Sequence, residues 1–504
     1  MTRLYKTFSL LFLISIGLRA IDVVKNLYIA SKLGVTYQAD VFLSLASLPD
    51  SLLVLFGLDS LKGIINSEYS SEINKSQYNI SESFNNLFRL LLVIGAIITV
   101  LILVFRVELI KLLLPGFADE RLTLAVYLSV FILPVFFIKP VSALLSAYYN
   151  SVKQYYIPVV PQVLVSLSIL FFVYFPILGT DVIVNIAYGF LIGSYLYFIV
   201  LILPQIFNKK IHFFKLLELD KLSRKIIKTC FMMFVVVMTN QIYLFTKNFF
   251  VSYFDDGSLA AINYGTSLPT FISSLTFTVV FGIILNNLSK LHSLNLVEDA
   301  NKLLSNTINS IIYIYIPIVV IMFLFNINIL NILYLRGNFD SHGIELTSNP
   351  FIWESLSLIP FVLFIMPVAM YLAYKDYKKY SKIGIIVYVA GILFNFILTK
   401  IFGYYGISIG TFINYSFMAF MLIYFSKTLS LKLKFDISDS FKLIFLGTVL
   451  TAVTYFFKIY VLDIYLIGTG ISALLIGSIF VFLLYYITTV ILKINYLNKI
   501  KLIF

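Results

Sequence analysis

Three charged residues interrupt an apolar run near the start of the chain. Arg19, Asp22 and Lys25 lie at three-residue spacing within GLRAIDVVKNLYIASKLGVTYQAD, residues 17–40. At about 100° per residue, a helix places Arg19, Asp22 and Asn26 within about 60° of one another, and Lys25 lies at the edge of that face. A charged side chain that faces lipid at mid-membrane costs roughly 2.5–3.5 kcal/mol. We therefore expect this face to line a polar cavity, and Arg–Asp pairing within the helix is compatible with that role.

Other charged residues lie in later apolar runs, mostly in the first half of the chain. Asp50 follows a proline, Asp59 comes soon after it, and Lys139 precedes another proline. Positive charge in such a cavity favours an anionic group such as a phosphate, because water is scarce there. The three histidines are far apart and Cys230 stands alone, which excludes a His or Cys metal site and a disulfide. The residue types predict anion binding rather than catalysis.

The elements that must position these residues are membrane helices. Of 504 residues, 60% are hydrophobic and only 12% are charged, whereas a soluble domain carries roughly 25% charged residues. Long unbroken apolar runs predict an all-α polytopic membrane protein. About fourteen spans are expected, at 8–31, 41–65, 86–106, 122–147, 155–178, 182–207, 223–250, 258–285, 308–335, 352–374, 382–402, 406–427, 442–465 and 468–492.

Basic residues are concentrated in alternate loops between these spans. The loops around residues 209–228, 375–382 and 427–442 are rich in lysine, which predicts that they and both termini are cytoplasmic. The net charge of +13 lies in such short loops, so we expect no nucleic-acid partner. The N-terminal run lacks a small-x-small cleavage site and is read as an uncleaved first span. No phosphate-binding loop of the Walker A type occurs, so the chain is not expected to be an ATPase.

Two stretches of the chain resemble each other, which predicts an internal repeat. Residues 113–158 and 333–384 each contain a turn with Leu-Thr, a helix with two prolines and an aromatic-basic turn. Pairing Tyr149 with Tyr374 gives an offset of 225 residues, about six helices, so the halves share one orientation and a pseudo-two-fold axis along the membrane normal. The predicted domains are a six-helix lobe at 1–207, a basic cytoplasmic linker at 208–222, a second six-helix lobe at 223–428 and a final helix pair at 442–492.

With these spans assigned, RAIDVVKNLYIASKLGVTYQADVFLSLASLPDSL resembles the N-terminal signature of the MurJ/MviN-like flippases. The likeness continues through LLPGFADERLT, SAYYNSVKQYYIPVVPQ, INYGTSLPTF, LYLRGNFDSHGIELT and MYLAYKDYKKYSKIGI, to about residue 425. It implies the MOP superfamily, alternating access, and translocation of an isoprenoid-linked glycan across the bacterial inner membrane. It also implies that Arg19, Lys25 (arginine in the family) and Asp40 carry functional charge in a central cavity.

Two departures from the family pattern change the expected substrate. Leu53 and Val54 stand where the family has an Arg-Arg pair, and Ser267 stands where it has an arginine. Several basic residues expected to hold the lipid II pyrophosphate are therefore absent, and Asp50 adds negative charge. The favoured function is thus a Wzx-like flippase for an undecaprenyl-pyrophosphate-linked repeat unit of O-antigen or another surface polysaccharide. The alternatives are a lipid II flippase for peptidoglycan synthesis and, further away, a multidrug or ion antiporter.

The expected site contains no catalytic residue and no metal. Its substrate-binding residues are predicted to be Arg19, Asp22, Lys25, Asn26, Asp40 and Lys139. The candidates for coupling to an ion, Na⁺ or H⁺, are Asp40, Asp50 and Asp59. No other cofactor is expected. The expected partners are the lipid-linked glycan, membrane lipid, and the polymerase and assembly enzymes of that glycan.

Overall fold

The computed structural model describes residues 2–56, 58, 63–66, 68, 69, 79–177, 179, 181–208, 219–426, 437–465 and 470–492. Asp59, a predicted ion-coupling residue, lies outside this described part. Within it the named elements are all helical, and a single isolated bridge joins Arg336 to Phe339. The helices form two compact units, Met1–Ala260 and Ala261–Phe504. The predicted domain boundaries at 208–222 and 428–442 stay predictions.

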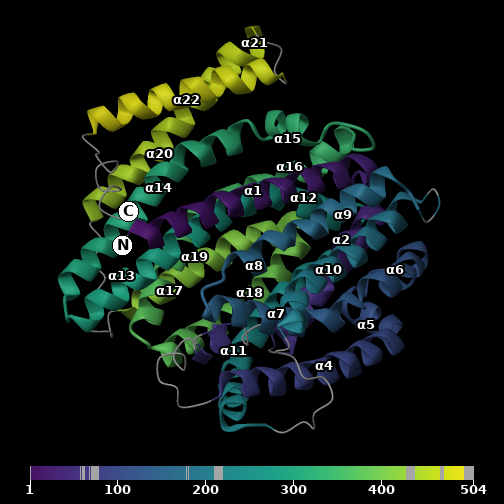
Figure 1. The fold of residues 1–504 in the computed structure, drawn as a ribbon. Helices are drawn as coiled ribbons and strands as arrows, with labels where there is room; N and C mark the ends of the chain where they lie inside the picture. Colours follow the sequence, from purple (N-terminus) through teal and green to yellow (C-terminus); the bar gives the residue numbers. More distant parts are fainter. Residues whose placement is uncertain are drawn as a thin grey trace. The chain divides into compact units, whose positions relative to one another are not determined.

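The first unit contains the charged residues singled out above. Figure 1 labels the helices that carry them. Its helices are α1 (Thr2–Leu33), α2 (Tyr37–Leu55), α4 (Ile80–Val104), α5 (Arg106–Leu113), α6 (Asp119–Ile132), α7 (Val135–Ser151), α8 (Tyr156–Val159), η1 (Val160–Gln162), α9 (Val163–Tyr174), α10 (Val182–Phe207) and α11 (Lys221–Val251).

The second unit continues from α12 (Ser258–Thr276), whose first residues belong to the first unit. It contains η2 (Phe277–Phe281), α13 (Gly282–Ser293), α14 (Val297–Leu324), α15 (Asn326–Tyr334), α16 (Ser341–Leu356), α17 (Leu358–Ala373), α18 (Tyr377–Phe402), η3 (Gly403–Tyr405), α19 (Gly406–Ser426), α20 (Ile437–Phe457), η4 (Lys458–Leu462), α21 (Asp463–Tyr465) and α22 (Ile471–Ile491). Its core joins α14, α20 and α22.

The prediction of an all-α polytopic membrane protein is confirmed. Each predicted span overlaps a described helix or consecutive described helices. Nine of the described helical segments are long and apolar enough to cross a membrane, or ten if α6 and α7, which bend by 42°, count as one span. The span predicted at 41–65 is shorter than expected, because α2 ends at Leu55, where Phe56 caps it. On α4, Val93, Ile97 and Val100 form an exposed apolar face, as contact with lipid requires.

The core of the first unit lies where α4, α7, α10 and α11 meet. Phe84 and Phe88 of α4 are buried there together with Leu144 of α7 and Ile226 of α11. Beside this core, α9 packs tightly along α10. A Cβ atom added to Gly193 would lie 2.7 Å from the Cα atom of Val165, so the glycine permits this close approach of the two backbones.

One structural turn occurs in both units and confirms the repeat in detail. The buried Tyr149 of α7 donates its hydroxyl hydrogen to the carbonyl of Leu201 (2.8 Å), and Tyr371 of α17 donates to Leu422 (3.0 Å). Four residues after each tyrosine, a lysine adopts positive φ: Lys153 at 63° and Lys375 at 57°. Tyr149 therefore corresponds to Tyr371, an offset of 222 residues (371 − 149).

The predicted pairing of Tyr149 with Tyr374 was wrong by three residues. At the corrected offset, Phe117 corresponds to Phe339, and both side chains are buried. The prolines do not coincide at this offset, since Pro140 falls opposite Val362. The prediction paired the tyrosines that begin the two aromatic-basic turns, whereas the hydrogen bonds identify Tyr371, three residues earlier, as the counterpart of Tyr149.

Candidate functional site

The charged face of α1 meets α9. Ser166 of α9 donates a hydrogen bond to Asp22 Oδ1 at 2.5 Å, and Lys25 Nζ lies 3.5 Å from the same oxygen. The Asp22 side chain is 42% exposed and that of Lys25 19%. The carboxylate is thus shared by a neutral donor and a cation, which lowers the cost of its place in an apolar helix. The predicted polar face is present, and its internal pairing is Lys25–Asp22 rather than Arg19–Asp22.

Arg19 lies three residues before Asp22 and is exposed. Within the described residues, no carboxylate pairs with Arg19. Asn26, on the same face, is half-buried. An arginine with no carboxylate partner keeps the planar set of guanidinium N–H donors, whose geometry suits a phosphate.

A second ion pair joins α2 to α7 in the same unit. Lys139 Nζ lies 2.6 Å from Asp50 Oδ1, and the two side chains are 25% and 63% exposed. Each residue adjoins a proline inside its helix, Pro140 or Pro49. The sequence identified both charges but not their pairing, because 89 residues separate them. Lys139 therefore has an anion beside it already.

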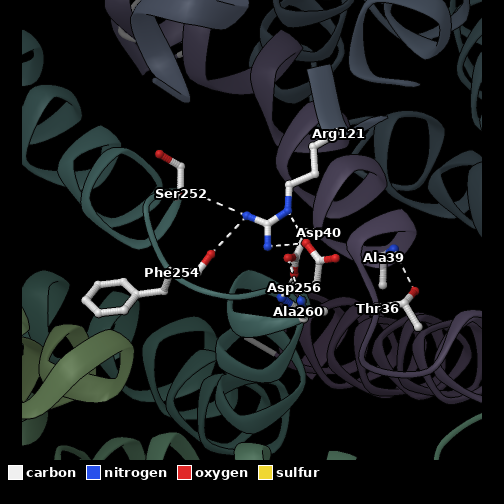
Figure 2. A network of polar contacts seen from close by, with 9 residues as sticks. Thr36, Ala39, Asp40, Arg121, Ser252, Phe254, Asp256 and Ala260 are labelled. Atoms are coloured by element: carbon white, nitrogen blue, oxygen red, sulfur yellow. Dashed lines mark hydrogen bonds and ion pairs between the residues drawn. The ribbon is translucent and has the colours of Figure 1, made fainter. Parts of the chain in front are cut away.

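The carboxylate of Asp40 is buried and hydrogen-bonded to backbone groups (Figure 2). It is 1% exposed, and its two oxygens accept hydrogen bonds from Gly257 N (2.7 Å) and Ala260 N (2.6 Å). These N–H groups belong to the first turn of α12, so Asp40 caps that helix from α2. In this conformation neither oxygen is accessible to a head group or an ion, although the family resemblance implies a cavity role.

Arg121 of α6 holds the turn that precedes α12, as Figure 2 shows. Its guanidinium pairs with Asp256 and donates to the carbonyl of Phe254 at 2.9 Å. Ser252, at the end of α11, accepts a hydrogen bond from Gly116 N at 3.0 Å. Together with Asp40, these contacts fasten the α11–α12 turn to α2 and to the segment between α5 and α6.

A buried polar network fastens the other end of α11 to α4. Arg89 of α4 is buried and donates to the Asn85 carbonyl (3.1 Å) and to Asn86 Oδ1 (2.6 Å). Asn86 in turn donates to Asp220 Oδ1 at 3.2 Å, and the Ser83 and Ser223 hydroxyls lie 3.0 Å apart. Sequence reasoning missed this network. Arg89 in the apolar run of α4 was its signal, but the contacts that link this helix to α11, Asn86–Asp220 and Ser83–Ser223, join residues 134 and 140 positions apart.

Asp220 is the N-cap of α11 and the link in this network, so it carries a testable prediction. Its Oδ2 accepts from Leu222 N at 3.2 Å. Replacing Asp220 with alanine is expected to destabilise the protein by about 1–2 kcal/mol, because the cap and the Asn86 partner are lost together. Thermal unfolding in detergent measures this. Asp181→Ala is the matched control, since Asp181 precedes α10 without a side-chain capping bond. Equal destabilisation by both variants would contradict the prediction.

The positions that depart from the family pattern have local roles. Leu53 is buried in the first unit. In the second unit, Ser267 donates to the carbonyl of Tyr264 at 2.8 Å, and its oxygen lies 2.6 Å from the hydroxyl of Tyr334. These positions are occupied by packing and neutral hydrogen bonds, so they supply no charge to a ligand. Across the described residues, no three His, Cys, Asp or Glu side chains are grouped as a metal site requires.

Comparison with known proteins gives one consistent result. A family model described as "Lipid II flippase MurJ" matches residues 29–489. The chain is 23% identical over 420 residues to "Probable lipid II flippase MurJ" of Buchnera aphidicola subsp. Baizongia pistaciae (strain Bp), covering 81% of this chain and 82% of the relative. It is 25% identical over 487 residues to the protein of the same description from Buchnera aphidicola subsp. Acyrthosiphon pisum (strain APS), covering 93% and 92%.

Solved structures show the same fold. The structure titled "Lipid II flippase MurJ, inward closed conformation" has a TM-score of 0.81, 20% sequence identity, and coverage of 97% of this chain and 100% of its own. A multidrug resistance MATE family transporter of the MOP superfamily, in its inward-facing conformation, has a TM-score of 0.63 at 14% identity, with coverage of 83% and 97%. At such identities the likeness establishes the fold alone. The family-model match begins after Lys25, so the charged face of α1 lies outside it.

Proposed function

Since the chain belongs to the MurJ lipid II flippase family, we propose that it translocates lipid II across the bacterial inner membrane for peptidoglycan synthesis. It is a multi-pass membrane transporter of the MOP superfamily and not an enzyme. The sequence departures favoured a polysaccharide repeat unit, with lipid II as the alternative. The family match over 29–489 and the descriptions of the curated relatives support the alternative instead.

The observation that carries the proposal is the set of cations in the first unit. Arg19 and Lys25 lie in the 32-residue α1, Lys139 lies in the bent α6–α7 span, and both lysines keep a carboxylate partner. An unpaired cation in such a helix is costly unless it serves an anionic ligand. The pyrophosphate of a lipid-linked glycan supplies that anion. Leu53, Val54 and Ser267 stand where the family has arginines and carry no charge. Arg19 and Lys139 therefore remain as the principal contacts with the pyrophosphate.

An apolar cavity in the second unit supports a lipid-linked substrate. It has a volume of about 740 Å³ and lies between α14, α17 and α20, with Ile316, Phe323, Leu363, Gly447 and Phe456 among its lining residues. Its walls offer contacts for methyl and methylene groups and almost no polar atoms. A long isoprenoid chain fits such a surface, whereas the sugar head group does not.

Reconstitution tests the proposal directly. The purified protein in liposomes is expected to move fluorescent lipid II from the inner to the outer leaflet, measured by quenching with a membrane-impermeant reagent. In cells that depend on it, depletion is expected to cause accumulation of lipid II and lysis. The same liposomes with an undecaprenyl-pyrophosphate-linked O-antigen unit provide the comparison. Transport of that unit without transport of lipid II would return the assignment to the polysaccharide class.

A further inference from the structure

Lys139 is held by a carboxylate of the same unit. Asp50 Oδ1 lies 2.6 Å from Lys139 Nζ, a distance typical of a charge-assisted hydrogen bond. Lys139 is only 25% exposed and sits in the middle of the α6–α7 span. A lysine there needs an anion beside it at all times, because the membrane interior offers little water to solvate it. Whatever anion the transporter carries, Lys139 can bind it only by exchanging one partner for another.

Among the three aspartates of the site that the structure describes, Asp50 is the one suited to such exchange. Asp40 is 1% exposed and holds two backbone N–H groups. Asp22 has two partners, Ser166 and Lys25. Asp50 has Lys139 as its single partner within the described residues, and its side chain is 63% exposed. Leaving Lys139 would therefore break only one contact.

We propose, building on the function proposed above, that Asp50 occupies the place of the substrate phosphate at Lys139 in the empty transporter and competes with every anionic lipid for that lysine. A carboxylate tethered to α2 is present at a high effective concentration. It lowers the apparent affinity of each anionic lipid by the same factor, so only a lipid that binds Lys139 strongly, as an anion of higher charge does, still occupies the site. The pyrophosphate of a lipid-linked glycan carries more negative charge than the phosphodiester of an ordinary phospholipid, which is far more abundant in the membrane.

Asp50 thus sets a threshold for occupancy of Lys139 and leaves the ratio of two ligands' affinities unchanged. Phosphatidylglycerol, with one negative charge, binds too weakly to displace Asp50. Lipid II binds strongly enough to displace it. This account gives a physical reason for an acidic residue in a cavity that must bind an anion, a feature that opposed the assignment of lipid II when only the sequence was considered.

The test compares Asp50→Asn with the natural protein, both solubilised in detergent. Native mass spectrometry titrations with lipid II and with phosphatidylglycerol give the two affinities. Asp50→Asn keeps the shape of the side chain but removes the competing charge. We expect its affinities for lipid II and for phosphatidylglycerol both to rise by about fivefold, so that phosphatidylglycerol occupies the site at lower concentrations than in the natural protein. Asp50→Glu retains the competitor and is expected to retain both affinities of the natural protein.

Two further variants make the result specific. Asp181→Asn removes an exposed carboxylate from the same unit and is expected to leave both affinities unchanged. In a Lys139→Met background, Asp50→Asn is expected to have no effect on either affinity, because the contested cation is gone. Unchanged affinities in Asp50→Asn, with lipid II still bound by the natural protein, would overturn this inference alone. Absence of lipid II binding and transport by the natural protein would instead refute the proposed function.

Discussion

Arg19→Ala is expected to abolish lipid II translocation while the protein remains folded and in the membrane. Arg19 is exposed on the charged face of α1, and none of the described carboxylates neutralises it. Its removal therefore leaves no partner unsatisfied, while the substrate loses a bidentate phosphate contact. Such a contact contributes roughly 1.5–3 kcal/mol, at least tenfold in affinity, before any effect on turnover. The liposome assay and complementation of a depleted strain measure the loss.

Lys32 in the same helix provides the matched control. It is exposed, its Nζ lies 5.6 Å from the ring centroid of Tyr28, and it lies near the end of α1, about two turns beyond Lys25. Lys32→Ala is expected to translocate lipid II normally. Arg19→Lys keeps the charge without the planar fork and is expected to fall between the two. Normal transport by Arg19→Ala, at equal amounts in the membrane, would exclude Arg19 from the binding site.

Asp40→Ala is expected to act through stability rather than through ligand binding. The substitution leaves Gly257 N and Ala260 N buried without an acceptor, which costs about 2–4 kcal/mol. The thermal unfolding midpoint in detergent is therefore expected to fall strongly, and transport to fall with the amount of folded protein. Asp40→Asn retains one acceptor oxygen and is expected to lose about half as much.

Gly257→Ala tests the same contact from the other side. Gly257 has a φ of 88° and a Cβ atom there would lie 2.6 Å from the carbonyl oxygen of Val35, so alanine is both strained and crowded. Its destabilisation should match that of Asp40→Ala, and the two should not add, because they break one contact. A variant at Asp40 that unfolds normally but fails to bind lipid II would instead support the cavity role that the family resemblance implies.

The helices and the charged face of α1 could be predicted because both depend on local patterns. Apolar runs of membrane length identify spans directly, and helical periodicity groups Arg19 with Asp22 wherever the helix lies. The partners could not be predicted in the same way. Ser166 lies 144 residues from Asp22. A serine in an apolar run has no signature that distinguishes a hydrogen-bond donor to a carboxylate from an ordinary packing residue.

Asp50 and Lys139 show a second limit. Each was recognised as a costly charge, and one was assigned to an ion and the other to the substrate. Their 2.6 Å contact depends on how α2 and α7 pack, which no periodicity within either helix specifies. The end of α2 at Leu55 was also missed. The sequence remains apolar beyond Leu55, and apolar residues occur in the connecting segments of a membrane protein as well as in its spans.

Helix α11 is anchored at both of its ends, by Asp220 to α4 and by the Ser252–Asp256 turn to α2 and α6. Its 31 residues extend about 46 Å, close to the roughly 40–45 Å of a bilayer with its head groups. Because a helix resists compression along its axis, α11 holds Asp220 and Ser252 at a fixed distance from each other. We therefore expect a displacement of one anchor to be accompanied by a displacement of the other.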